Sequence, residues 1–551
     1  MKELVLLGDE AVALGALHAG VTGCFGYPGT PSTEILEYII NSSDRSETTV
    51  AQWCTNEKTA YETALGFSFS GKRALVTMKH VGLNVAADPF MNSSLCQIKG
   101  GLVCIVADDP SMHSSQGEQD SRFYADFAMV PLFEPVTQQE AYEMIGEAFD
   151  LSEKWHVPVM MRLVTRLSHS RAQIRTADSP RAQNALEKGL PADWMLLPAL
   201  ARKNYAKMID KQDDLLSWSN KWDRNTLEIN PSRTDLAIIT SSLGRNYFEE
   251  NLADYAASCG KAGLPSLLHI AGMPLPLEKI RALADSAQTI LVIEEGMPFI
   301  EKQLRGLVPG KNRIIGKFTG ELPRAGELNP DLVRAALGLS AKKTILDTVT
   351  PPVLPARPPQ LCKGCPHHDS YSSLNTAVEI LNEREGAVST VVAADIGCYA
   401  LGAVAPLKAV ETIVCMGASI GMARGASEAG YKYTFGVIGD STFLHSGLTG
   451  LVDAVSTNTP LTVIILDNSI VAMTGCQTTM LPSAQLEKIV LGIGVEPEHC
   501  RVIDTKPNLV EENTKIILEE AEYRGVSVII MVRECLEAVR LRKKKEAITR
   551  A

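Results

Sequence analysis

The first third of the chain alternates between two patterns of apolar residues. Short apolar runs stand at 74–78 (ALVTM), 101–108 (GLVCIVAD) and 157–164 (VPVMMRLV), and helix-length amphipathic segments separate them. This alternation predicts a parallel sheet covered by helices. The first 20 residues are largely apolar but include Asp9 and Glu10 within the run. They predict a strand that leads into a helix.

The rest of the chain repeats this rhythm twice. Residues 176–233 are polar and helical in pattern without strands, which predicts a linking helical segment. Strands are then predicted at 235–242 (DLAIITSS) and 289–296 (TILVIEEG). Three later runs, STVVAADIG, YTFGVIGD and LTVIILDN, are almost continuously apolar, as is typical of strands buried on both faces.

A proline-dense segment, TPPVLPARPPQL at 350–361, marks the clearest boundary, because it suits neither a helix nor a central strand. We therefore predict an α/β fold with several doubly wound parallel-sheet domains. The predicted boundaries are 1–175 for the first α/β domain, 176–233 for the helical linking segment, 234–345 for the second α/β domain, 346–361 for the proline-rich linker and 362–551 for the third α/β domain.

Composition narrows the class of protein. A chain of 551 residues with 45% apolar and 21% charged residues has the profile of a soluble globular α/β enzyme. The net charge of −11, with basic residues concentrated only at 540–545, argues against a nucleic-acid surface. No apolar stretch is long enough to span a bilayer and the N-terminus has no cleavage signal, so we expect no membrane association and a cytoplasmic location. Twelve cysteines there predict free thiols rather than disulfides.

Two of the buried strands in the third domain end in polar residues. One ends in GDS at 439–441, and the next ends in DN at 467–468. Ligands of open α/β sheets bind at such carboxyl ends. The Asp440 carboxylate, the Asn468 amide oxygen and the Ile470 carbonyl would give three hard oxygen ligands for Mg²⁺, with diphosphate and water completing the shell. The alternative is a plain Gly-Asp turn, and the paired strands and their spacing favour the metal site.

Two candidate residues of the first domain follow predicted strands. Glu57 begins an Ala-rich helix in NEKTAYETAL, where a glutamate is also favoured by the helix dipole alone. Thr30 lies in GCFGYPGTPSTEI, which is also a turn that Ser32 or Thr33 would follow as a helix cap.

Four cysteines need an explanation other than core packing. Cys362 and Cys365 form a CxxC after the proline-dense segment, Cys398 follows a buried strand in DIGCY, and Cys535 follows the last strand. Thiolates suit iron–sulfur clusters. The run CKGCPHH also offers two cysteines and two histidines for zinc, and unligated thiols are a third alternative.

Together these motifs resemble the indolepyruvate ferredoxin oxidoreductase family of thiamine-diphosphate-dependent 2-oxoacid oxidoreductases. The runs GDST and DNSxxAMTG match its diphosphate motif, GYPGTP matches its YPxTP loop, and the CxxC, IGC and late cysteine match the ligands of a cluster in the related pyruvate enzymes. The resemblance implies thiamine diphosphate, Mg²⁺ and a [4Fe-4S] cluster as cofactors, and coenzyme A as co-substrate. It makes 1–175 the pyrimidine-binding domain, 234–345 a transketolase C-terminal-like domain and 362–551 the diphosphate-binding domain.

The resemblance also implies residue roles. Glu57 would bond the aminopyrimidine ring, Thr30 would hold the substrate carboxylate, and His80, beside Lys79, would face the cofactor. Cofactor contacts are implied at Glu57, Gly439, Asp440, Ser441, Asn468 and Ile470. Metal ligands are implied at Asp440, Asn468 and Ile470 for Mg²⁺, and at Cys362, Cys365, Cys398 and Cys535 for the cluster.

The implied reaction is oxidative decarboxylation of a 2-oxoacid, by analogy an aryl pyruvate such as indolepyruvate, to acyl-CoA with electrons passed to ferredoxin. The implied partners are a smaller beta-type subunit and a ferredoxin or ferredoxin-like subunit. At least a dimer of this chain is expected, because thiamine enzymes often build their site across a subunit interface.

The sequence departs from the general thiamine motif at two positions, and from the family pattern at one further position and in one expected domain. Ser441 and Asp467 replace a glycine and an asparagine of the general thiamine motif, and Cys476 stands where the family has histidine. The sequence has no CxxCxxCxxxCP run, so the family's usual C-terminal ferredoxin-like domain is not expected. Two alternatives follow: a non-oxidative thiamine-dependent decarboxylase or carboligase, and a non-catalytic thiamine-binding subunit. The intact Glu57, Asp440 and Asn468 count against the second.

Overall fold

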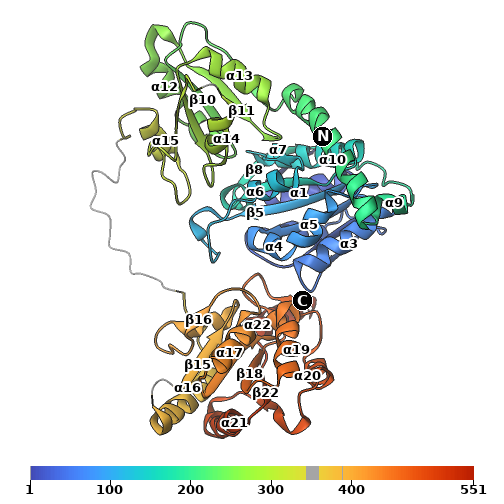
Figure 1. Cartoon of the computed structure of the whole chain (residues 1–551), viewed down its shortest axis with the longest axis vertical. Helices are drawn as coiled ribbons and strands as arrows, with labels where there is room; N and C mark the ends of the chain where they lie inside the picture. Colours follow the sequence, from blue (N-terminus) through green and yellow to red (C-terminus); the bar gives the residue numbers. More distant parts are fainter. Residues whose placement is uncertain (1, 309, 343–358, 387–388, 551) are drawn as a thin grey trace. The chain divides into compact units, whose positions relative to one another are not determined.

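The computed structural model describes residues 2–308, 310–342, 359–386 and 389–550, and it divides into two compact units, Met1–Pro351 and Pro352–Ala551 (Figure 1). The first two predicted α/β domains therefore fall in one unit and the third in the other. The predicted linker at 346–361 lies largely within 343–358, outside the described residues.

In the described part of the first unit, the main sheet has seven strands in the order β12-β6-β7-β5-β4-β2-β3. The strands are β2 (Gly23–Gly26), β3 (Val50–Trp53), β4 (Ala74–Lys79), β5 (Leu102–Asp108), β6 (Leu132–Phe133), β7 (Val159–Val164) and β12 (Gly272–Met273). Neighbours run parallel, except that β12 pairs antiparallel with β6. The strands predicted at 74–78, 101–108 and 157–164 are β4, β5 and β7, so this part of the prediction is confirmed.

Helices cover both faces of this sheet. Leu75 and Val103 belong to one apolar cluster, which includes side chains of α1 (Gly8–His18) and α7 (Gln138–Trp155). Val76 and Cys104, one position further along β4 and β5, belong to the opposite cluster with α3 (Glu57–Phe69) and α5 (Ala87–Ser93). Because successive side chains of a strand point to opposite faces, these strands are apolar on both, which explains their continuous apolar runs.

The N-terminal strand lies apart from the main sheet. As predicted, β1 (Lys2–Leu7) leads directly into α1. It pairs antiparallel with β8 (Arg171–Thr176), so that the beginning of the chain and the end of the first predicted domain form a two-stranded ribbon. The shorter helices of this region are α2 (Thr33–Asn41), α4 (His80–Val85), α6 (Arg122–Ala128) and α8 (Thr165–His169).

A second sheet of the first unit has, among the described residues, five strands in the order β14-β13-β10-β11-β9. They are β9 (Thr226–Glu228), β10 (Leu236–Ser241), β11 (Ser266–Ile270), β13 (Thr289–Glu294) and β14 (Arg313–Ile315). The strands predicted at 235–242 and 289–296 are β10 and β13. The accompanying helices are α11 (Gly244–Glu249), α12 (Leu252–Cys259), α13 (Leu277–Ser286), α14 (Phe299–Leu307) and α15 (Pro330–Ala336).

The segment 176–233 is less helical than its pattern predicts. It contains α9 (Pro191–Trp194) and the long α10 (Pro198–Lys221), but residues 177–190 form neither helix nor strand. The prediction of a segment without strands is wrong, because β9 lies near its end and pairs antiparallel with β11, with Leu227 opposite Leu268. A strand of three residues is too short to produce a recognisable alternation.

Two fully buried arginines join the two sheets of the first unit. Arg162 of β7 bonds Asp108 and Glu134 at 2.5 and 2.6 Å, and it also donates to the carbonyl of Glu295 at the end of β13. Arg122 bonds Asp120 at 2.6 Å and reaches Glu294 of β13 at 2.8 Å. Buried charges persist only where they are paired. This network and the β12–β6 pairing explain why the first two predicted domains form one compact unit.

The second unit has, in its described residues, one six-stranded parallel sheet in the order β16-β15-β17-β18-β22-β21. The strands are β15 (Thr390–Ala394), β16 (Thr412–Ile413), β17 (Tyr433–Gly439), β18 (Leu461–Asp467), β21 (Cys500–Asp504) and β22 (Val526–Val532). The helices around it are α16 (Pro366–Glu385), α17 (Ala418–Glu428), α19 (Leu448–Thr457), α20 (Leu486–Ile493) and α21 (Val510–Glu522). All the strands predicted for this domain are present, and the α/β parallel-sheet fold class is confirmed.

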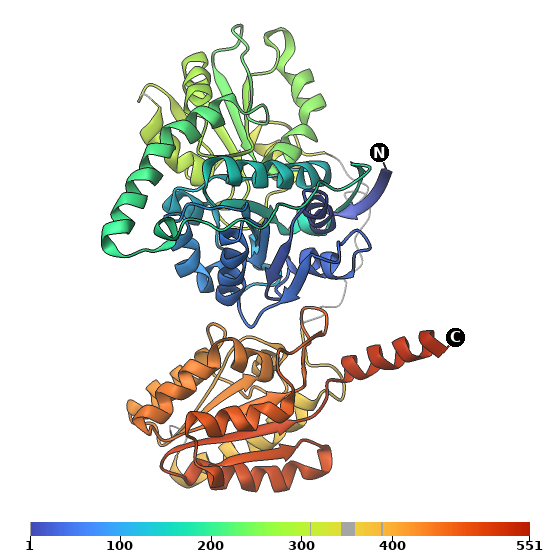
Figure 2. The same cartoon turned by 90° about the vertical axis from the view of Figure 1, so that its right-hand side faces the viewer.

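The second unit ends in α22 (Leu536–Arg550), which projects away from the six-stranded sheet (Figure 2). The basic run at 540–545 lies on this helix. Of the helices described in either unit, none combines the length and apolar character needed to cross a membrane.

Replacing Arg162 with methionine should destabilise the first unit strongly. The change leaves Asp108 and Glu134 buried without their cation, which costs about 3–5 kcal/mol when a buried pair is broken. All five tryptophans lie between 53 and 222, so urea unfolding followed by tryptophan fluorescence reports on this unit alone.

The matched control is Arg175→Met, because Arg175 pairs with Glu3 at the surface. Losing such a surface ion pair lowers the free energy of unfolding by only about 0–1 kcal/mol. Equal midpoints for the two variants would show that the buried network contributes no more than a surface ion pair.

Candidate functional site

Asp440 links the carboxyl ends of two neighbouring strands in the second unit. It follows β17 directly, and its carboxylate oxygens accept hydrogen bonds from the backbone nitrogens of Ser441 and Ser469, each at 2.8 Å. Ser469 lies just after β18. Close packing requires glycine at position 439, because a Cβ there would lie 2.7 Å from the Tyr399 ring. The predicted residues at the two strand ends therefore lie side by side.

Asp467 adds a second carboxylate at this place. One of its oxygens accepts from the Ser469 nitrogen at 3.1 Å, and among the described residues the other oxygen is buried without a hydrogen-bond partner. Burial, and then repulsion from Asp467, raises the pKa of Asp440 well above its usual value. Two adjacent buried carboxylates and an amide form a donor set that suits a hard divalent cation. In the sequence, Asp467 was recognised only as a departure from the general thiamine motif. In the structure, Asp467 lies beside Asp440 and adds a carboxylate to this donor set.

Asn468 connects this donor set to the cysteine motifs. Its side-chain nitrogen lies 3.2 Å from Nε2 of His367, and its carbonyl accepts from the backbone nitrogen of Cys535 at 3.3 Å. Burial lowers the pKa of His367 to about 4, so the imidazole is neutral and accepts the amide hydrogen. The Asn468 side-chain oxygen accepts from the nitrogen of Ile470 at 3.1 Å. Ile470 begins the short strand β19 (Ile470–Val471).

The four predicted cysteines lie in one region of the second unit. Cys362 and Cys365 are joined by a turn hydrogen bond of 3.0 Å at the start of α16, and Cys398 begins η4 (Cys398–Ala403). Burial raises the pKa of the Cys398 thiol to about 12, and the charges of Cys365, Cys535 and Cys362 contribute in that order. The contribution of Cys476, smaller than these, identifies a fifth thiol close by.

The zinc alternative lacks the compact geometry that it requires. A tetrahedral zinc ion holds its thiolate ligands only about 4 Å apart. Throughout the described ranges, no three cysteine or histidine ligand atoms come within 4.8 Å of one another. His367 is also engaged with Asn468 rather than with the thiols.

In the first unit, Glu57 is buried at the start of α3. Its carboxylate packs against α4, where a Cβ at Gly82 would lie 2.5 Å from the Glu57 Oε1 atom. Asn56 caps the helix by accepting from the nitrogen of Thr59 at 2.9 Å. Helix capping is therefore served by Asn56, and the Glu57 side chain lies against Gly82.

Lys79 is hydrogen-bonded, through Ser114, to the loop that carries Thr30. Its ammonium donates to the carbonyl of Ser114 at 2.9 Å, and the Ser114 hydroxyl donates to the carbonyl of Thr30 at 3.3 Å. Burial lowers the pKa of Lys79, while Asp109 and Glu57 act in the opposite direction. Thr30 follows β2 and Lys79 ends β4, so both lie at the carboxyl edge of the main sheet, where ligands of such sheets bind.

His80 is almost completely buried beside this loop. Its Nε2 atom lies 3.0 Å from the carbonyl of Gly117. Its Nδ1 atom is buried and, within the residues described, has no hydrogen-bond partner. A buried ring nitrogen without a partner is available to a substrate or cofactor.

Ser32 and Thr33, which the sequence offered as helix caps, bond within the GYPGTP turn instead. The Thr33 hydroxyl accepts from the nitrogen of Gly29 at 2.9 Å, and the Ser32 hydroxyl donates to the carbonyl of Gly29 at 2.8 Å. The Ser32 side chain makes no capping hydrogen bond to α2. Both hydroxyls stabilise the turn that carries Thr30 instead of capping the helix.

Asp395 is a further buried carboxylate at the end of a strand, and the sequence analysis did not single it out. It follows β15, is fully buried, and accepts hydrogen bonds from the hydroxyls of Tyr399 and, at 2.8 Å, Ser419. Burial raises its pKa to about 6. Its position at the end of a buried strand, directly before the IGC motif, was a signal in the sequence, because Asp440 and Asn468 were found by the same rule.

Comparison with known proteins identifies related chains. The model described as pyruvate flavodoxin/ferredoxin oxidoreductase, thiamine diP-bdg, matches residues 14–201, and thiamine pyrophosphate enzyme, C-terminal TPP binding domain, matches 395–530. Indolepyruvate oxidoreductase subunit IorA of Archaeoglobus fulgidus is 34% identical over 97% of this chain and 86% of its own. The subunit of the same name from Methanothermobacter thermautotrophicus is 34% identical over 97% and 87%.

A solved 2-oxoglutarate:ferredoxin oxidoreductase from Magnetococcus marinus aligns with 61% of this chain and 65% of its own, at 17% identity and a TM-score of 0.48. The fold and the two thiamine-binding domains define an enzyme of the thiamine-diphosphate-dependent 2-oxoacid oxidoreductase class. Within that class, the chain belongs to the family of the indolepyruvate oxidoreductase subunits IorA, which confirms the resemblance found in its motifs.

Replacing Asp440 with asparagine should weaken magnesium-dependent binding of thiamine diphosphate at least about tenfold, the change that 1.4 kcal/mol of lost attraction produces. The side chain keeps its size but loses the charge that a divalent cation needs. Isothermal titration of thiamine diphosphate in the presence of Mg²⁺ measures the effect.

Asp453→Asn is the matched control, because Asp453 lies in the same unit but pairs with Arg424 at the surface. Unchanged affinity in Asp440→Asn would remove this residue from the magnesium site.

Proposed function

We propose that this chain is the large, catalytic subunit of a complex that oxidatively decarboxylates a 2-oxoacid to acyl-CoA and passes the electrons to ferredoxin. The substrate class is aryl pyruvates such as indolepyruvate, by analogy with the names of the relatives. One observation carries the proposal: Asn468 contacts both His367, beside the CxxC motif, and Cys535. A cofactor held at Asp440 and Asn468 would therefore be close to the cysteines.

The cofactor residues have distinct tasks in this proposal. Asp440, Asn468 and the Ile470 carbonyl would hold Mg²⁺, with Asp467 beside them, while Gly439 and Ser441 would approach the diphosphate. Thiamine diphosphate, when bound, supplies the carbon nucleophile and electron sink that 2-oxoacid decarboxylation requires. The unpartnered Asp467 oxygen and the two adjacent buried carboxylates support the magnesium assignment.

In the first unit, Glu57 would accept or donate a proton at the aminopyrimidine ring. Gly82 supports this role, because its missing side chain leaves the carboxylate against α4. Thr30 would orient the substrate carboxylate. The Lys79 ammonium is joined to the same loop, because Ser114 bonds both Lys79 and Thr30. His80 would hydrogen-bond substrate or cofactor through its buried Nδ1 atom.

Cys362, Cys365, Cys398 and Cys535 would bind a [4Fe-4S] cluster. Such a cluster transfers one electron at a time, which an oxidation coupled to ferredoxin requires. Mutual electrostatic effects among these thiols support their grouping. Among the described residues, no three cysteine or histidine ligand atoms come together closely enough for a single zinc ion, which supports the cluster over zinc.

The proposal includes a multisubunit complex. A smaller beta-type subunit and ferredoxin or a ferredoxin-like subunit would complete the electron pathway, and coenzyme A would take the acyl group. We also propose at least a dimer of this chain. A cytoplasmic location agrees with its twelve free thiols, because reducing compartments keep cysteines unpaired.

Anaerobically purified protein should contain roughly four irons and matching acid-labile sulfide per chain. Cys398→Ala should lose most of both, because it removes one of four ligands. Chemical analysis with an ultraviolet-visible spectrum measures this outcome. Cys500→Ala is the matched control and should retain the cluster. Cys500 also belongs to the second unit, but its charged neighbours are Glu487 and Glu520 and not the four cysteines. Iron content that is equally high in Cys398→Ala would contradict the ligand assignment.

The complex isolated through a tag on this chain should reduce a viologen dye when given an aryl pyruvate and coenzyme A. Glu57→Gln should lower that rate about 100-fold or more, as loss of a general acid–base group does. Glu62→Gln should keep it, because Glu62 lies on the same helix but pairs with Lys58 at the surface. Aldehyde formation without dye reduction would overturn the oxidative reaction and identify a non-oxidative decarboxylase.

A further inference from the structure

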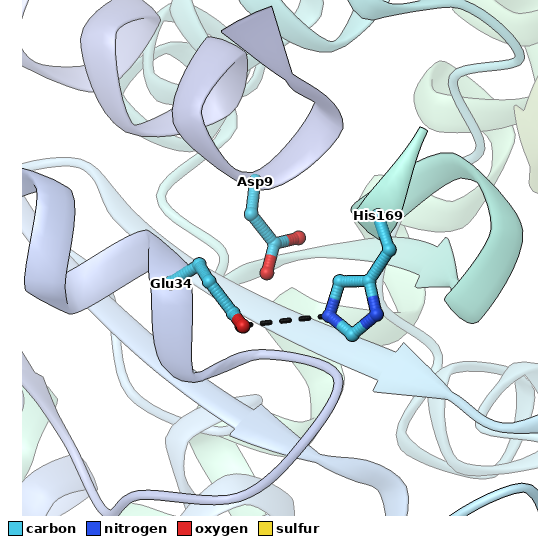
Figure 3. Close-up of side chains that lie close together, drawn as sticks. All are labelled: Asp9, Glu34 and His169. Atoms are coloured by element: carbon cyan, nitrogen blue, oxygen red, sulfur yellow. Dashed lines mark ion pairs between the residues drawn. The ribbon is translucent and has the colours of Figure 1, made fainter. Parts of the chain in front are cut away.

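Three ionisable side chains of the first unit, Asp9, Glu34 and His169, meet at one place. Asp9 lies in the first turn of α1, Glu34 in the first turn of α2, and His169 at the end of α8. Each offers a ligand atom, and these atoms lie within 4.8 Å of one another. Figure 3 shows the Asp9 carboxylate pointing between the other two side chains. Residues from three separate elements thus converge on one point.

Asp9 is the unusual member of the group. Its side chain is fully buried, and neither carboxylate oxygen has a hydrogen-bond partner among the described residues. Burial raises its pKa strongly, and the neighbouring Ser168 hydroxyl only partly opposes that shift. A buried carboxyl group without partners costs several kcal/mol, in order of magnitude, whether it is ionised or protonated.

The neighbouring ion pair does not satisfy Asp9. His169 Nε2 lies 3.5 Å from Glu34 Oε2, too far for a good hydrogen bond. That Glu34 oxygen is itself buried and, in the part of the chain described, also lacks a hydrogen-bond donor. Even with His169 protonated, the three groups carry one excess negative charge when both carboxylates are ionised. The two Asp9 oxygens therefore lack any partner among the described residues, and Glu34 Oε2 has only its loose ion pair with His169.

The surroundings would attract a cation. Glu34 also lines a surface hollow of about 370 Å³, whose other acidic residues are Glu10, Glu37 and Asp44. The lining contains neither lysine nor arginine. The side chains of Glu34 and His169 are 36% and 34% exposed, so both have room to adjust around an ion. An entering cation would meet only negative or neutral groups.

We propose that Asp9, Glu34 and His169 bind a divalent first-row transition metal ion. Two carboxylates and one imidazole form a ligand set used for Mn²⁺, Fe²⁺ and Zn²⁺, and three protein ligands leave further positions for water. The ion would neutralise Asp9 and tie α1, α2 and α8 together. Because α2 follows the loop that carries Thr30, the ion would also stabilise the position of that loop. This site is independent of the thiamine chemistry proposed above.

Mn²⁺ is the probe of choice, because its unbound form is measured directly by electron paramagnetic resonance and thiols bind it weakly. The full chain is titrated with Mn²⁺ in the presence of excess Mg²⁺ and thiamine diphosphate, which occupy the Asp440 region. Wild-type protein should bind one more Mn²⁺ per chain than Asp9→Asn or His169→Gln. Pulsed resonance should detect a nitrogen coupling from an imidazole, and His169→Gln should lose it.

Glu37→Gln is the matched control, because Glu37 lies on α2 and lines the same hollow without belonging to the triad. It should keep the extra Mn²⁺. A second measurement follows unfolding of the first unit by tryptophan fluorescence: Mn²⁺ should raise the melting temperature of wild type and Glu37→Gln but not that of Asp9→Asn.

Equal Mn²⁺ binding in wild type, Asp9→Asn and His169→Gln would overturn the proposal. So would loss of binding in Glu37→Gln to the same degree, which would indicate diffuse attraction by an acidic surface. Because His169 is partly exposed, His169→Gln keeps the test decisive even if Asp9→Asn does not fold.

Discussion

The buried arginines Arg122 and Arg162 are the constraint on which the first unit depends. Their guanidinium groups are out of water, and they are tolerable only because carboxylates from both sheets surround them. The same network fixes Asp120, which follows the segment whose Gly117 carbonyl lies against His80. The backbone carbonyl that His80 approaches therefore lies close in sequence to a residue held by this charge network.

In the second unit, the parallel sheet positions the candidate site residues. Parallel strands bring all their carboxyl ends to one edge, so side chains that follow different strands meet there. Asp440, Asp395 and Asn468 occupy this edge, after β17, β15 and β18, and Cys535 shares a hydrogen bond with Asn468. Because Asp440 accepts from the nitrogens that follow both β17 and β18, the two strand ends cannot move apart without losing those bonds.

The longer apolar strands, the fold class and the family could be predicted from the sequence. Each depends on local patterns, such as the apolar runs that form β4, β17 and β18 and the motif GDST. The short strand β9 and the single unit formed by two sheets could not, since both depend on partners far along the chain. Asp467 was seen only as a deviation from a motif. The grouping of Asp9, Glu34 and His169 is invisible locally, because nothing near Asp9 indicates that residue 169 returns to it.

The order in which the cysteines occur has a consequence for biosynthesis. Cys362 opens the second unit, whereas Cys535 follows its last strand, β22, which lies between β18 and β21 in the sheet. Pairing over such long separations is slow, and it cannot begin before the final strand has left the ribosome. Any group that needs both thiols can therefore be bound only after β22 has been synthesised, so its insertion depends on the fold of the second unit from Cys362 to Cys535.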